Sequence, residues 1–115
     1  MSLSLPLPSE KKLFVTYRVE PGCLGPTGED YVEEFCQLAE KGVAKVDADF
    51  VHWHITPRYD KTLGEMHYSV DGKDLSHDKA EKYLRLFEKE LDEFEGHLQD
   101  NLANMIDLYL KRINT

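Results

Sequence analysis

The sequence predicts an α+β domain built on a small three-stranded sheet, with helices covering one face. Residues 12–20, 50–58 and 65–70 alternate apolar and polar side chains, as half-buried strands do. Residues 28–41 and 77–113 instead repeat apolar side chains at three- and four-residue steps, which is the helical spacing. The expected order is therefore β-α-β-β-α-α. We expect a ferredoxin-like, split βαβ arrangement without its last strand, in which the first strand lies beside the third.

The length of 115 residues fits one domain. Residues 1–10 are expected to form an extended, flexible arm, because Pro6 and Pro8 favour polyproline geometry and remove backbone donors. Residues 11–115 are expected to form the single α+β domain.

Composition disfavours several classes of function. A formal net charge of −8 disfavours binding to nucleic acid and to anionic membranes. No apolar run approaches the roughly 20 residues that span a bilayer, and the first residues lack the basic segment of a secretory signal. Two cysteines do not make a secreted disulfide framework. We therefore expect a cytoplasmic protein.

The first strand places Leu13, Val15, Tyr17 and Val19 on its apolar face. Phe14 breaks the alternation, which indicates partial cover on the second face as well. The loop at 21–28 contains three glycines, but their spacing matches no phosphate-binding loop. The following helix carries Cys36 on its apolar stripe, where a thiol acts as a small hydrophobe.

Residues 50–58 and 65–70 are predicted to pair as a β-hairpin. Opposing Tyr59 with Gly64 would place Arg58 opposite Glu65 and Thr56 opposite His67. Pro57 cannot donate to a ladder, so the first of these strands should be an edge strand or carry a bulge there. Residues 71–74 are expected to form a turn.

Strand parity separates two faces of this hairpin. One face carries Trp53 and its alternate neighbours, and Trp53 is predicted to be a core anchor. The other face carries the candidate ligand-binding residues His52, His54, Arg58, Glu65 and His67.

The simplest interpretation of the histidine face is an ordinary polar surface. Alternatively, His52, His54 and His67 would be the ligands if the face held a metal ion, although no metal or cofactor is expected. A third interpretation is a metal-free pocket, with Arg58 holding a carboxylate and a histidine acting as acid or base. A nucleophilic mechanism is unsupported, since neither cysteine can be placed beside the histidines.

The long apolar stripe of residues 77–113 is unusual for so small a domain. Gly96 is a weak helix former, so we expect either a break near Glu95–His97 or a continuous helix that pairs with a second subunit. Residues 86–110 hold seven acids and one base, a net charge of −6, which suggests a solvated face or a docking surface for a basic protein.

Three functions remain open. The leading hypothesis is association without catalysis, through homodimerisation or another protein partner, because the sheet is incomplete and the apolar stripe is overlong. The first alternative is a metal- or small-ligand-binding enzyme or sensor that uses the histidine face. The second alternative is an acidic decoy or inhibitor that binds a basic partner.

Overall fold

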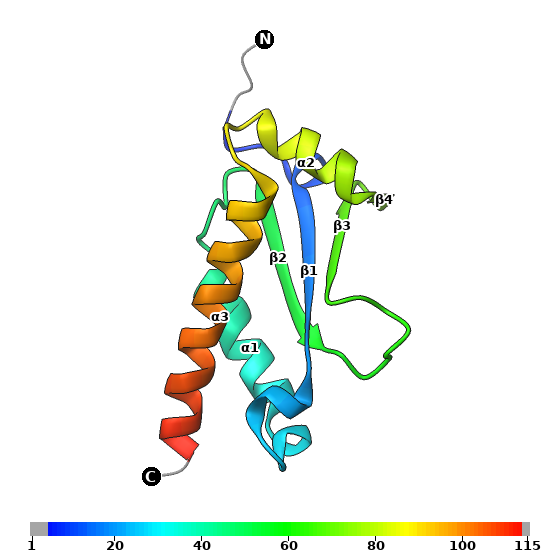
Figure 1. Cartoon of the computed structure of the whole chain (residues 1–115). Coiled ribbons are helices and arrows are strands. Elements are labelled where there is room, and N and C mark those ends of the chain that lie inside the picture. The colour runs from blue at the N-terminus through cyan, green and yellow to red at the C-terminus, as the bar shows by residue number, and fades with distance from the viewer. Residues whose placement is uncertain (1–4, 114–115) are drawn as a thin grey trace.

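A mixed four-stranded sheet in the order β2-β1-β3-β4 forms the centre of the computed structural model, which describes residues 5–113 (Figure 1). The strands are β1 (Leu13–Val19), β2 (Val51–Pro57), β3 (Met66–Val70) and β4 (Lys73–Leu75). The helices are α1 (Val32–Val43), α2 (His77–Arg85) and α3 (Leu91–Ile113), with short 3-10 turns at Ser9–Lys11, Pro21–Leu24 and Gly28–Asp30. The predicted α+β class is confirmed. Within the described residues, none of the helices is both long and apolar enough to cross a bilayer.

β1 lies in the interior of the sheet. It pairs in parallel with β2, to which α1 connects it, and antiparallel with β3. The first strand therefore lies beside the third, as predicted, and β2 is an edge strand, as Pro57 indicated. The predicted hairpin between 50–58 and 65–70 is wrong, because β1 separates the two strands.

The physical reason is the helical crossover. A strand–helix–strand unit packs its helix on the sheet by placing its two strands parallel in one sheet. β2 takes one side of β1, so β3 pairs with the side that remains. The βαβ unit is consequently not split, and the ferredoxin-like order is also wrong. Residues 58–65 cross the end of β1 to join the two flanking strands (Figure 1).

The sheet has a fourth strand that the alternation of apolar and polar residues does not predict. Asp71 and Gly72 form the two-residue turn between β3 and β4, with φ values of 52° and 76°. Two consecutive positive φ angles suit a tight hairpin turn, for which Asp-Gly is a favoured sequence. The turn was expected, but β4 has only three residues, too few to show an alternating pattern.

The core lies between the sheet and the helices. α1 and α3 lie together on one side of the sheet, and α2 crosses the end at which β1 begins (Figure 1). Trp53 is buried and stacks on Phe94 of α3, with ring centroids 5.2 Å apart. Its predicted role as a core anchor is confirmed.

The N-terminal segment contributes to this core. Leu7 is buried, and its backbone N–H donates a hydrogen bond to the carbonyl of Asp49 at 2.8 Å. Of the arm expected over residues 1–10, residues 1–4 lie outside the described part of the chain.

The predicted break in the last helical region lies earlier than expected. Gly96 is inside α3, and the chain turns between Arg85 and Leu91, where Glu88 has a φ of 61°. Phe87 in this turn stacks on Phe50 with ring centroids 4.4 Å apart. The turn lets α2 cover the end of the sheet while α3 covers its face. The apolar stripe is thus largely buried within one chain.

Candidate functional site on the open face of the sheet

The strands direct a second set of side chains away from the helices. Successive strand residues point to opposite faces, so the neighbours of the buried Val15, Trp53 and Tyr68 point outward. This outward set, which we call the open face, comprises Phe14, Thr16, Arg18, His52, His54, Thr56, His67, Ser69 and Asp74. The predicted shared face of the three histidines is confirmed by the register.

Thr16 of β1 stands between two of the predicted histidines. Its Cα partner in β2 is His54, and its Cα partner in β3 is His67. Although it points away from the helices, Thr16 is only 8% exposed. The predicted pairing of Thr56 with His67 is wrong, because Thr16 is the Cα partner of His67.

A different carboxylate holds each of these two imidazoles. His54 Nδ1 lies 3.1 Å from Glu40 Oε1 of α1, and His67 Nε2 lies 2.8 Å from Asp74 Oδ1 of β4. A carboxylate accepts a hydrogen bond from the ring nitrogen that carries a proton, and so selects the tautomer of a neutral imidazole. Glu40 and Asp74 belong to elements on opposite sides of β1, so these contacts do not draw the two imidazoles together.

His52 is in contact with an aromatic ring. It stacks on Phe14, with ring centroids 4.7 Å apart and an interplanar angle of 30°. The Phe14 ring is 38% exposed, although phenylalanine is usually buried. The two rings line an open hollow of about 520 Å³. Its other lining residues are Ser9, Glu10, Lys12, Ser69, Asp71 and Gly72. The break in alternation at Phe14 was the sequence signal for this feature.

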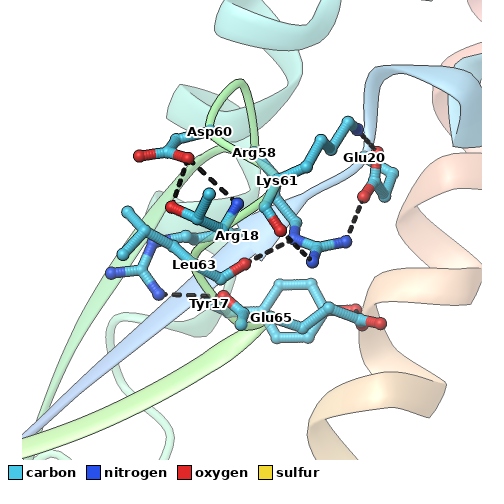
Figure 2. A network of polar contacts seen from close by, with 10 residues as sticks. Tyr17, Arg18, Glu20, Arg58, Asp60, Lys61, Leu63 and Glu65 are labelled. Atoms are coloured by element: carbon cyan, nitrogen blue, oxygen red, sulfur yellow. Dashed lines mark hydrogen bonds and ion pairs between the residues drawn. The ribbon is translucent and has the colours of Figure 1, made fainter.

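Arg58 and Glu65 lie in the connection between β2 and β3 (Figure 2), and the hydrogen bonds that they form involve none of the three histidines. Arg58 donates hydrogen bonds to the Leu63 carbonyl at 2.8 Å and to the Lys61 carbonyl at 3.3 Å, and it pairs with Glu20. Glu65 instead accepts a hydrogen bond from the Tyr17 hydroxyl at 3.0 Å. The predicted cross-strand pair of Arg58 and Glu65 is therefore wrong, since their segments are not paired.

The contacts of Arg58 order this connection. Glu20 is held by both Lys61 and Arg58, and these hydrogen-bonding cations lower the pKa of its carboxyl group. On the other side, Arg18 donates to the Gly64 carbonyl at 2.8 Å. The arginines thus bind backbone carbonyls and one carboxylate of their own chain, which is a structural role.

One group of potential metal ligands appears within residues 5–113, and it contains none of the predicted histidines. Donor atoms of His77, Asp78 and Glu81 lie within 4.8 Å of one another at the start of α2. Acidic side chains in the first turn of a helix are stabilised by the helix dipole. Glu81 also pairs with Arg85 at 2.5 Å. These ordinary roles account for the cluster.

Neither of the two thiols supplies a nucleophile beside the histidines. Cys36 is buried in α1, and burial raises its pKa to about 12, so its thiol stays protonated. Cys23 is exposed and lies in the 3-10 turn Pro21–Leu24, outside the sheet.

Comparisons of this chain with protein-family models, with curated proteins and with solved structures gave no match. The open face combines an exposed aromatic pair, hydroxyl groups and imidazoles on a broad surface.

Proposed function

We propose that this protein is a non-catalytic binding module that docks a partner protein on the open face of its sheet. The exposed stack of Phe14 on His52 is the observation that carries this proposal. Aromatic residues are enriched at protein interfaces, where they supply contact area at low conformational cost. A partner segment with an apolar or aromatic side chain suits such a platform.

The open face carries no net charge, which favours a partner whose docking surface is also uncharged. With histidine neutral, Arg18 contributes one positive charge and Asp74 one negative charge, so the face sums to zero. The whole chain carries −8, and this excess therefore lies elsewhere. Charge depletion is typical of the centre of a protein interface.

The shape of the face also favours a protein over a small molecule. Small-molecule sites are concave and bury most of their ligand. The hollow beside Phe14 and His52 is open, and the outward side chains of the sheet extend beyond it.

Both cysteines are free thiols, which fits the reducing compartment expected from the sequence.

Docking on the face is favoured over strand addition at the sheet edge. The outer edge of β2 is blocked, because the Ile55 N–H binds Glu40 Oε1 and Pro57 has no N–H. At the other edge, β4 has only three residues. Neither edge offers a long row of unpaired backbone groups.

Photo-crosslinking tests this proposal. A benzoyl-phenylalanine replaces Phe14 in one variant and Leu86 in a matched control, since Leu86 is 66% exposed but lies outside the sheet. Irradiation in the source cells is expected to give a discrete adduct with another protein at position 14 and not at position 86. Equal labelling at both positions, or no protein adduct at position 14, would contradict the proposal.

A further inference from the structure

We propose that two copies of this chain associate through antiparallel α3 helices, with Leu108 of each copy filling a cavity beside the first turns of the other copy's α3. This inference concerns the helical side of the molecule and does not depend on the proposed function of the open face.

One exposed side of α3 carries a stripe of residues that is complementary to itself. Its residues recur every three or four positions, so they share one side of the helix, and all are exposed: Glu93, His97, Asn101, Asn104, Leu108 and Arg112. A twofold axis between residues 102 and 103 places Arg112 opposite Glu93. The same axis places Leu108 opposite His97, and Asn104 opposite Asn101. A twofold interface requires this reciprocity, because each contact must occur twice.

Leu108 is the apolar anchor of the stripe. Its side chain is 67% exposed. His97, the residue opposite it, lines a cavity of about 150 Å³. The walls of that cavity include Val43, Val46 and the ring of Trp53. It therefore has room for one branched aliphatic side chain, with apolar groups on part of its lining. Anchors that fill a pocket in the partner dominate the affinity of many interfaces.

Charge complementarity favours a second copy over other occupants. The cavity is also lined by the acidic residues Glu88, Glu90 and Glu93, while Asp47 is paired with Lys89 at 3.6 Å. The last turn of α3 carries Lys111 and Arg112. Antiparallel packing brings this basic end against the acidic residues of the cavity twice, once at each end of the interface. The acidic part of α3 would thus bind a basic segment of a second copy of the same protein. These contacts would offset the repulsion between two copies that each carry a net charge of −8.

The proposed dimer leaves the open faces free. α3 covers the opposite side of the sheet from Phe14, so each copy would present its open face outward (Figure 1). A dimer of this kind would offer two docking faces to its partners.

Size-exclusion chromatography with light scattering tests the dimer at high micromolar concentration. The unmodified chain is expected at twice its mass of 13.3 kDa. Leu108→Glu is expected to weaken the dimer about 30-fold or more, the usual effect of losing an interface hot spot. Phe14→Glu, the matched control on the open face, should remain dimeric. Circular dichroism checks that each variant is folded.

A charge exchange separates the proposed pairing from a general loss of solubility. Glu93→Arg alone should weaken the dimer, and Glu93→Arg combined with Arg112→Glu should restore it, since the exchanged charges still face each other. A monomeric unmodified chain would overturn the proposal. Dissociation by Phe14→Glu, unaltered dimerisation of folded Leu108→Glu, or failure of the double exchange to restore the dimer would also overturn it.

Discussion

The backbone N–H of Ile55 donates a hydrogen bond to the side-chain carboxylate of Glu40, with 2.9 Å between the nitrogen and Oε1. The same oxygen lies 3.1 Å from His54 Nδ1. A helix side chain thus accepts the hydrogen bond of a backbone N–H on the edge strand β2. Without this contact, the N–H could pair with another chain. This contact keeps β2 as an edge while leaving the face of the sheet open.

Removing that carboxylate should destabilise the protein and expose the edge. We expect Glu40→Ala to lower the free energy of unfolding by about 1 kcal/mol, the net value of one hydrogen bond on a half-exposed surface. Glu40→Gln keeps an acceptor oxygen and should cost less. Urea denaturation measures both changes, and light scattering measures aggregation. Equal stability of Glu40→Ala and the unmodified chain would show that the contact is not stabilising.

The pairs of Glu20 with Lys61 and Arg58 should make the stability of the protein pH-dependent. These cations lower the pKa of Glu20 in the folded chain. The contribution of the Glu20 carboxylate to the free energy of unfolding is therefore present at pH values above about 4.3, which is its pKa in the unfolded chain. This contribution is lost as the pH falls through the lower pKa of the folded chain. We expect Glu20→Gln to lower the urea midpoint at neutral pH, and this difference should shrink in acid. The exposed Glu10→Gln serves as the control, and a difference that grows in acid would contradict the assignment.

The two cysteines should differ sharply in reactivity. Cys36 is buried with a pKa raised to about 12, whereas Cys23 is exposed. A thiol reagent that consumes thiolate should label one thiol per native chain at mildly alkaline pH and two after denaturation. Cys23→Ser should abolish labelling of the native chain. Rapid labelling of native Cys23→Ser would show that α1 opens easily or that Cys36 is not buried.

Two glycines should respond in opposite directions to alanine. Gly96 lies inside α3, where an added methyl group would meet no heavy atom within 4 Å, so Gly96→Ala should stabilise the protein by about 1 kcal/mol through helix propensity. Gly72 has a φ of 76°, so Gly72→Ala should destabilise the protein by about 1–2 kcal/mol. Thermal denaturation measures both, and loss of stability in Gly96→Ala would place the helix break where the sequence suggested.

The sequence could predict which side of each strand is buried, because alternation is a local property. It identified Trp53 as a core residue and placed His52, His54 and His67 on one face. It also located the helices approximately and indicated at Pro57 that β2 is an edge strand.

Strand order could not be read in the same way, since it depends on how the crossover helix packs. The predicted hairpin has the correct side of each strand buried. It pairs β2 directly with β3, however, whereas β1 lies between them. The partners of the histidines were missed for the same reason. Glu40 and Asp74 belong to elements that meet the histidines only after the chain has folded. The helix break was misplaced because the packing of Phe87 on Phe50, rather than the weak helix propensity of Gly96, accompanies the turn.

The order β2-β1-β3 underlies the open face, because it places His54 and His67 on either side of Thr16. Nuclear Overhauser spectroscopy tests it most directly. We expect cross-strand contacts from Thr16 to both His54 and His67. Contacts between His54 and Ser69 in their place would show that β2 and β3 pair directly, and would contradict the strand order on which the proposed docking face depends.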